Sequence, residues 1–210
     1  SPAINSQLRE EMCLKSEFIA TSIGYVGAGT IEYLYDENSN KYYFMEMNTR
    51  IQVEHPVTEM ITGYDLVKNQ ILCHANIALS KEKLDSIKLR GHSIECRINA
   101  ENTKKNFMPS PGQITSLHLP GGIGIRVDTH VYAGYTVPSN YDSMIAKIIV
   151  HADTRKEAIN RMLGALDECV IEGIHTTIPL HKVILQDFDF INGNFNTNYL
   201  EGLIKEKNDG

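Results

Sequence analysis

The sequence predicts an α+β fold, in which runs of strands stand beside separate helices instead of alternating with them. Two aromatic-rich segments, 30–35 and 41–48, flank the turn-forming cluster DENS, which is typical of a β-hairpin. In the second half, strand-like segments are divided by Gly/Pro turns, and a helix follows whose first turn pairs Thr154 with Glu157 as a capping box. These patterns argue against a doubly wound sheet.

An amphipathic helix is predicted over residues 6–23, with Ser6 as its N-cap and Gly24 as its stop. The hairpin follows, and residues 49–57 then read as an extended segment that ends at Pro56. The apolar stripe of the helix consists of Leu8, Met12, Ile19 and Ile23.

A second helix is predicted over residues 64–76, and residues 79–91 read as a polar connection. We therefore place a domain boundary near residue 90, which divides the chain into domains 1–90 and 91–210. Strands are expected in the second domain over residues 92–100, 113–119, 123–132 and 142–152.

Two helices close the predicted fold. The first follows Thr154, stops at Gly173 and buries a stripe of Ala158, Met162, Leu166 and Val170. The second covers residues 176–188 and has Pro179 in its first turn.

Composition excludes several function classes. The 210 residues are 42% hydrophobic and 22% charged, with a net charge of -6, so a nucleic-acid-binding surface is not expected. No apolar run has the length of a membrane span, and the start lacks a signal peptide. The four scattered cysteines predict reduced, mostly buried thiols in a reducing compartment. The chain has no Met at its start, and we expect it to be a piece of something longer.

Two glutamates of the hairpin are the first candidate site residues. If the turn lies at 38–40, residues whose numbers add to about 78 lie opposite each other, which pairs Glu32 with Glu46. Like charges directly opposite destabilise a sheet unless they share a cation. Oxygen-rich sites of this kind favour Mg²⁺ or Mn²⁺. The alternative is a strand face whose carboxylates are simply solvated.

The run EMNTRIQVEHP adds a polar set at alternate positions, Glu46, Asn48, Arg50, Gln52 and Glu54. In an extended chain these side chains share one face. Arg50 can grip a planar carboxylate or carbonate, Gln52 can add a donor, and Glu54 can accept a proton. Because a small anion is shorter than the spacing along a straight strand, we expect the chain to bend here.

Arg97 stands in an otherwise apolar and small-residue run, IECRINA. Its guanidinium either pairs with Glu95 or Glu101 or is aimed at a site, and composition does not separate the two. The glycines of GYVGAGT match no phosphate-binding motif and are interpreted as a helix stop and close packing. His55 is interpreted as a structural, hydrogen-bonding histidine.

At EMNTRIQVEHPVTE the sequence closely resembles the biotin carboxylase family of the ATP-grasp superfamily. The resemblance continues through RGHSIECRINAE, HVYAGYTVPSNYDSMIAKI and EGIHTTIPLH, and covers residues 20 to 201. The wording AGYTVP and YDSMI is most similar to the biotin carboxylase subunit of bacterial-type acetyl-CoA carboxylase. The fold implied is the C-terminal part of an ATP-grasp domain, followed by the mostly antiparallel biotin carboxylase C-terminal domain.

The resemblance implies a two-step reaction. ATP and bicarbonate give carboxyphosphate, whose carboxyl group moves to N1′ of biotin on a carrier protein, which is the first half-reaction of acetyl-CoA carboxylase in fatty acid synthesis. Glu32, Glu46 and Asn48 match positions that hold magnesium or manganese, two ions per site. Arg50, Gln52 and the backbone of Val53 match the bicarbonate pocket, and Glu54 matches the base. Arg97 matches the residue that stabilises the enolate oxygen of biotin, while Leu34 and Thr197 match positions beside the nucleotide.

The family also implies partners: a biotin carboxyl carrier protein, carboxyltransferase subunits and, in the full-length form, a second copy of the chain, with Arg126 and Ile123 at the interface positions. We expect a cytoplasmic or plastid-stromal enzyme without nucleic-acid or membrane partners. The family's N-terminal and lid domains carry lysines for ATP that have no match here, so this fragment is expected to be inactive alone. Alternatives are the biotin carboxylase domain of a pyruvate or other acyl-CoA carboxylase, another ATP-grasp ligase, or a non-catalytic assembly module.

Overall fold

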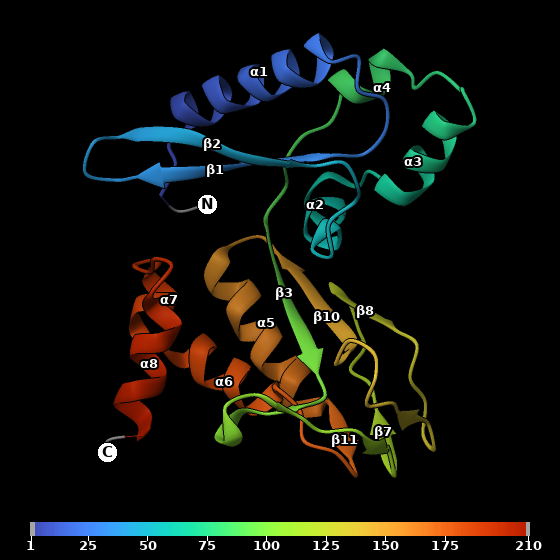
Figure 1. The fold of residues 1–210 in the computed structure, drawn as a ribbon, viewed down its shortest axis with the longest axis vertical. Helices are drawn as coiled ribbons and strands as arrows, with labels where there is room; N and C mark the ends of the chain where they lie inside the picture. The colour runs from blue at the N-terminus through green and yellow to red at the C-terminus, as the bar shows by residue number, and fades with distance from the viewer. Residues whose placement is uncertain (1–2, 209–210) are drawn as a thin grey trace. The chain divides into compact units, whose positions relative to one another are not determined.

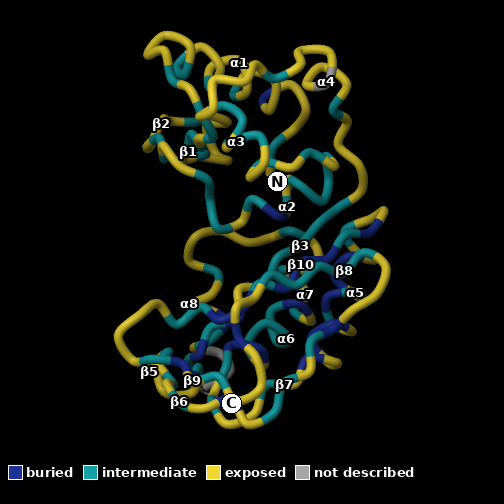
Figure 2. The backbone as a smooth tube through the Cα atoms, turned by 90° about the vertical axis from the view of Figure 1, so that its right-hand side faces the viewer, coloured by how far each residue is buried: buried dark blue, intermediate teal, exposed yellow. Residues whose placement is uncertain are grey.

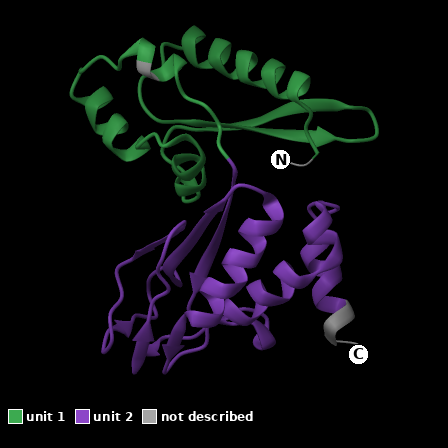
Figure 3. Cartoon of the chain, turned by 180° about the vertical axis from the view of Figure 1, so that it is seen from behind, with its two compact units in different colours: residues 1–90 green, residues 91–210 purple. Residues whose placement is uncertain are grey.

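The computed structural model describes residues 3–208, and it divides the chain into two compact units, Ser1–Arg90 and Gly91–Gly210 (Figure 3). Each unit mixes helices with antiparallel strands, as Figure 1 shows, so the α+β class is confirmed. The elements of the first unit are α1 (Ser6–Ser22), β1 (Thr30–Asp36), β2 (Lys41–Asn48), α2 (His55–Thr62), α3 (Leu66–His74) and α4 (Lys81–Asp85).

The second unit contains more and shorter elements. Its strands are β3 (His92–Asn99), β4 (Glu101–Asn102), β5 (Met108–Pro109), β6 (Gly112–Gln113), β7 (Ser116–His118), β8 (Ile125–Thr129), β9 (Thr136–Val137), β10 (Met144–Ala152) and β11 (Val170–Glu172). Its helices are the 3₁₀ turn η1 (Thr103–Lys105), α5 (Arg155–Glu168), α6 (Ile178–Gln186), α7 (Phe188–Asn192) and α8 (Tyr199–Asn208).

Helix α1 lies along the β1–β2 hairpin, and its N-cap is Asn5, whose Oδ1 accepts the Leu8 N–H at 2.9 Å. The predicted cap Ser6 is therefore wrong: it is already the first helical residue, because Asn5 has the extended backbone that a cap needs. The predicted stripe is also only partly right. Leu8 is buried, whereas Ile23 is 63% exposed because it is the C-cap, beyond the last helical turn.

The hairpin has the predicted register where it matters. Thr30 pairs with Asn48 and Glu32 with Glu46, after which a β-bulge shifts the pairing so that Tyr33 faces Phe44. The bulge keeps the carboxylates opposite each other while the aromatic residues that follow change partners.

The segment after β2 differs from the prediction. An extended run ending at Pro56 is wrong, since α2 begins at His55 and Pro56 lies in its first turn. Proline is tolerated there because the first N–H groups of a helix have no intrahelical partner. Helix α3 begins after the cap Asp65, whose side chain accepts the Lys68 N–H, and the short α4 interrupts the predicted polar connection.

The second unit is built on a three-stranded antiparallel sheet in the order β3-β10-β8, with α5 packed against β10 and β3. Most of the buried residues lie in this unit (Figure 2). In the described part of the first unit, only Leu8 and Pro56 are buried. Members of the core between sheet and helix include Ile98, Ile148, Val150, Ala158, Met162 and Leu166.

Two boundary predictions in the second unit are corrected by strand partners that are distant in sequence. The segment 113–119 is not one strand, because the N–H of Ile114 bonds to Tyr135 and that of Thr115 to Glu172, so the chain passes from one partner to another. Val170 does not continue the helical stripe. It pairs with His118 across β11 and β7, and α5 ends at Glu168.

The thiols are less buried than predicted. Cys96 and Cys169 are buried, Cys73 is half-buried and Cys13 is exposed. Burial raises the pKa of the Cys96 thiol to about 12, which keeps it protonated and unreactive. Among the described residues, no helix combines the length and apolar character needed to cross a bilayer.

The capping box of α5 gives a stability prediction. Thr154 Oγ1 accepts the Glu157 N–H at 3.2 Å, and Glu157 returns the bond to the Thr154 N–H. Thr154→Ala is expected to lower the free energy of unfolding by about 1 kcal/mol, because the first-turn N–H loses its acceptor. Urea denaturation measures this. The exposed first-turn change Lys156→Ala is the control, and equal midpoints for the two variants would contradict the prediction.

Candidate functional site

The β1–β2 hairpin brings two carboxylates and an amide together. Asn48 Nδ2 donates to Glu32 Oε1 at 2.8 Å and to Glu46 Oε1 at 3.1 Å, so one amide bridges the two acids. Glu32 and Asn48 are half-buried and Glu46 is exposed. The repulsion expected from the opposed acids is thus partly offset by a shared donor, at a place that still reaches solvent.

Beyond Asn48 the chain bends, as the sequence predicted, and the polar side chains gather around the hairpin. Gln52 Nε2 donates to Glu32 Oε1 at 2.9 Å. Arg50 donates through Nη1 to Gln52 Oε1 at 3.0 Å and through Nη2 to Asn48 Oδ1 at 3.2 Å. Five residues, Glu32, Glu46, Asn48, Arg50 and Gln52, therefore form one hydrogen-bonded network, which we call the hairpin network.

Glu54 lies at the turn from this network into α2. It is the N-cap residue of α2, but its side chain makes no capping hydrogen bond. Together with Arg50 and Gln52 it lines a cavity of about 360 Å³, whose opposite wall is the segment 27–30. Val53 lies in the turn just before Glu54. A guanidinium, an amide and a carboxylate thus border one small cavity, which suits a planar anion that must also lose a proton.

Two residues beside the cavity have supporting contacts. His55 Nδ1 lies 2.8 Å from the carbonyl oxygen of Gln52, and its Nε2 lies 4.0 Å from Glu59 Oε2. The ring therefore fastens the turn to α2, in line with the structural interpretation of this histidine.

The cavity wall at 27–30 was not predicted as part of a site. Gly27 has φ +125°, and a Cβ there would lie 3.0 Å from the His74 ring, which supports the interpretation as close packing. The same segment nevertheless faces Arg50 and Glu54 across the cavity. The signal in the sequence was indirect: these small residues immediately precede the strand that carries Glu32.

The donor set of the hairpin network suits a hard divalent cation. Two carboxylates and one amide are oxygen ligands of the kind that Mg²⁺ and Mn²⁺ prefer. No group of three or more His, Cys, Asp or Glu side chains gathers anywhere in the described range. Asn48 now turns its NH₂ toward the acids, so its oxygen would reach a cation only after the amide turns over.

Leu34 is also on the hairpin, whereas the other predicted site residues lie in the second unit. Leu34 is 55% exposed and pairs with Tyr43, which is equally exposed. Thr197 lies in the loop before α8 and is exposed.

Arg97 is exposed on β3, on the sheet face opposite α5, because its neighbours Cys96 and Ile98 point into the core. It lies directly opposite Lys147 of β10, whose Nζ is 3.7 Å from Asp128 Oδ2. The sheet face at Arg97 is therefore charged, and it places two cations side by side.

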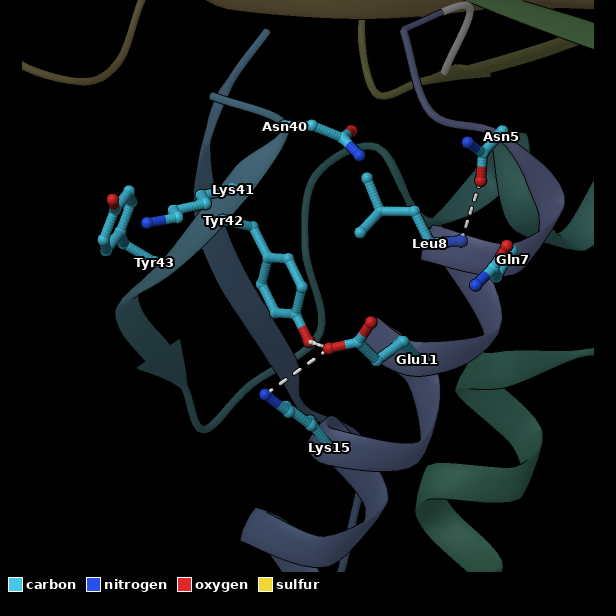
Figure 4. A pocket seen from close by; sticks show the side chains of 9 residues that line it. All are labelled: Asn5, Gln7, Leu8, Glu11, Lys15, Asn40, Lys41, Tyr42 and Tyr43. Carbon is cyan, nitrogen blue, oxygen red and sulfur yellow. Dashed lines mark hydrogen bonds and ion pairs between the residues drawn. The ribbon is translucent and has the colours of Figure 1, made fainter. Parts of the chain in front are cut away.

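Another cavity of the first unit, of about 350 Å³, lies between α1 and the start of β2 (Figure 4). Tyr42 donates to Glu11 Oε1 at 2.7 Å, and Lys15 Nζ lies 3.5 Å from the same oxygen. These groups satisfy each other, as the figure shows, and none belongs to the hairpin network.

Comparison with known proteins supports the resemblance seen in the motifs. Residues 95–202 match the family described as "Biotin carboxylase C-terminal domain", and residues 1–82 match "Carbamoyl-phosphate synthase L chain, ATP binding domain". Biotin carboxylase 1 of Bacillus subtilis is 56% identical over 201 residues, 96% of this chain and 44% of that protein. A pyruvate carboxylase protein of Methanothermobacter thermautotrophicus is 51% identical, over 96% of this chain and 40% of that protein.

A solved structure agrees with the sequence matches. The biotin carboxylase domain dimer of Hydrogenobacter thermophilus 2-oxoglutarate carboxylase, in complex with MgADP, ADP and bicarbonate, superposes with a TM-score of 0.91 at 48% identity, over 96% of this chain and 45% of that one. The chain thus spans less than half the length of the relatives it matches. Since the C-terminal-domain family alone matches more than half of the chain, the chain belongs to the biotin carboxylase family.

Proposed function

We propose that this chain contributes to the ATP-dependent carboxylation of carrier-bound biotin by bicarbonate. The observation that carries the proposal is the hairpin network, in which Arg50 and Gln52 are held by Asn48 and Glu32 beside the cavity that Glu54 lines. A network fixed by side-chain hydrogen bonds is preorganised for a small anion, because little reorganisation is needed when the anion binds.

We propose further that residues 1–90 are the C-terminal part of an ATP-grasp core and residues 91–210 the biotin carboxylase C-terminal domain. The scarcity of buried residues in the first unit supports this division, since α1 leaves Leu14 60% and Phe18 72% exposed. In the intact enzyme, meaning this chain joined to the domains that the family carries ahead of it, such faces have a covering partner. By itself the chain is expected to show no bicarbonate-dependent ATP hydrolysis.

Glu32, Glu46 and Asn48 would hold the Mg²⁺ or Mn²⁺ that accompanies ATP. A divalent cation at this place neutralises charge on the phosphates during transfer. Leu34 and Thr197 are proposed to border the nucleotide.

In the first step, Arg50, Gln52 and the backbone of Val53 bind bicarbonate, and Glu54 takes its proton. A bicarbonate oxygen then attacks the γ-phosphorus of ATP, the bond from phosphorus to the bridging oxygen breaks, and ADP leaves. The product of this step is carboxyphosphate. The role of Arg50 is electrostatic, because its charge stabilises the anion while Glu54 is protonated.

In the second step, the carboxyl carbon of carboxyphosphate forms a bond to N1′ of biotin, and its bond to the phosphate oxygen breaks, which releases phosphate. N1′ must lose its proton first, and the negative charge then spreads to the ureido oxygen. Arg97 is proposed to stabilise that charge.

The proposed partners are a biotin carboxyl carrier protein, carboxyltransferase subunits and a second copy of the enzyme, with Arg126 and Ile123 at the contact between copies. Ile123 is 95% exposed, which suits such a contact. We place the enzyme in acetyl-CoA carboxylase and fatty acid synthesis, in the cytosol or plastid stroma. The similarity to pyruvate and 2-oxoglutarate carboxylase chains supports a different final acceptor as the second candidate. Assays with purified carrier and carboxyltransferase of each type distinguish the two.

Removing one acid of the hairpin network tests the metal assignment. In the intact enzyme, Glu46→Gln and Glu32→Gln are each expected to raise the Mg²⁺ concentration needed for half-maximal ATP turnover by roughly tenfold, the scale of one charged interaction. Glu37→Gln, at the exposed hairpin turn, is the control and should leave it unchanged. If both network variants behave like the control, the acids do not hold the metal.

A further inference from the structure

Strand β3, which carries Arg97, is an edge strand of its sheet. It pairs with β10 on one side only, and in an antiparallel pair every second residue directs its backbone groups away from the partner. Outward-directed groups of an edge strand usually bind water, and such an edge opens more easily than a paired one. In β3, however, the outward groups around Arg97 have protein partners.

Those partners come from the N-terminal end of α6. Thr177 Oγ1 donates to the carbonyl oxygen of Arg97 at 3.1 Å and accepts the Asn99 N–H at 3.0 Å. The Thr177 N–H also donates to the carbonyl oxygen of Asn99 at 3.1 Å. Thr177 is 6% exposed, so these bonds are shielded from water.

His181, one helical turn further along α6, binds the same carbonyl. Its Nε2 lies 2.8 Å from the carbonyl oxygen of Arg97. Burial lowers the pKa of His181, while the hydrogen bond to Arg97 opposes this shift. At neutral pH the ring is therefore uncharged, and Nε2 carries the hydrogen that the carbonyl accepts.

The carbonyl of Arg97 thus accepts two hydrogen bonds from α6, and the next outward N–H is fixed by one of the same donors. These contacts restrain the backbone dihedral angle that follows the Cα of Arg97, and so the direction in which its side chain leaves the strand. None of them touches the guanidinium. Because a misplacement of about 1 Å can cost about 10²-fold in rate, the anchor of a charge-stabilising arginine affects catalysis without contacting substrate.

We propose that Thr177 and His181 are positioning residues that hold Arg97 for the biotin-carboxylation step. The inference rests on the proposed role of Arg97 and adds to it the device that fixes this residue. It identifies the junction of α6 with the β3 edge as part of the machinery of the second step only, since the first step uses the hairpin network.

The test uses the intact enzyme and compares two variants of Thr177. Thr177→Val keeps the shape but removes the hydroxyl, whereas Thr177→Ser keeps it. Thr177→Val is expected to reduce biotin carboxylation by roughly 10–100-fold, the usual range for a supporting residue, and to leave bicarbonate-dependent ATP hydrolysis within about twofold. Thr177→Ser is expected to restore most of the carboxylation rate.

A matched control lies on the other edge of the same sheet. Thr129 Oγ1 on β8 donates to the carbonyl oxygen of Ile145 at 2.7 Å and accepts the Val131 N–H at 3.2 Å, the same kind of bridge but far from Arg97 in the strand order. Thr129→Val should lower the melting temperature without separating the two activities. Equal losses of both activities in Thr177→Val, as in this control, would overturn the positioning role.

A second pair of variants applies if Thr177→Val does not fold. His181→Gln keeps a side-chain N–H donor and His181→Leu removes it, so carboxylation should fall in the second variant and be largely kept in the first. Equal rates for these two variants would overturn the proposal. Arg97→Met is measured alongside them. If it leaves carboxylation intact, the proposed function of Arg97 fails, whereas a loss there with no effect at Thr177 or His181 defeats the positioning inference alone.

Discussion

Replacement of Glu54 by Gln in the intact enzyme is expected to abolish both half-reactions, with a loss of about 10²–10⁴-fold in bicarbonate-dependent ATP hydrolysis and in biotin carboxylation. Gln has nearly the shape of Glu but cannot accept the proton that bicarbonate must lose before it attacks ATP. Since carboxyphosphate is the substrate of the second step, the second activity falls with the first. Both rates are measured on one preparation, with ADP release and ¹⁴C-bicarbonate incorporation into biotin as readouts.

The structure allows this result to be separated from a loss of stability. Glu54 is the N-cap of α2, yet its side chain makes no capping hydrogen bond, so Gln should leave the melting temperature nearly unchanged. Glu17→Gln, on the exposed face of α1, is the control for removal of one negative charge. Retention of more than a tenth of either activity by Glu54→Gln would show that another group takes the proton.

Arg97→Met is expected to separate the two steps. Biotin carboxylation should fall by about 10²–10³-fold, the cost of one lost oxyanion donor, while slow bicarbonate-dependent ATP hydrolysis without biotin continues. The reason is that charge develops on the ureido oxygen only when N1′ is deprotonated. If Arg97 were instead a structural ion-pair residue of β3, both activities and the melting temperature would fall together.

The position of Arg97 opposite Lys147 makes the stability result informative in either direction. Like charges directly opposite destabilise a sheet, so removal of Arg97 should not lower the melting temperature and can raise it slightly. A residue kept in a locally unfavourable place is expected at a functional site. A melting temperature lowered by several degrees would instead indicate that Arg97 is needed for folding.

The site shows where sequence reasoning succeeds. The opposition of Glu32 and Glu46 followed from the position of a hairpin turn, because the pairing of a hairpin is fixed locally by its loop. The bend after Asn48 followed from the mismatch between strand spacing and a small ligand. The bonds of Gln52 and Asn48 to Glu32 could not be deduced, since they depend on how far the chain folds back.

What the sequence determined by itself was local. The capping box at Thr154, the proline in the first turn of α6 and the hairpin pairing each depend on residues only a few positions apart, and the structure has them all. Tertiary structure decided the choice of distant partners. Residues 113–119 divide between β9 and β11, and Val170 leaves a helical pattern to pair with His118. The grip of Thr177 on the β3 edge joins residues about 80 positions apart. Such contacts form only when the ordering of both segments is offset by burial and hydrogen bonds that neither segment has alone, so no short stretch of sequence specifies them.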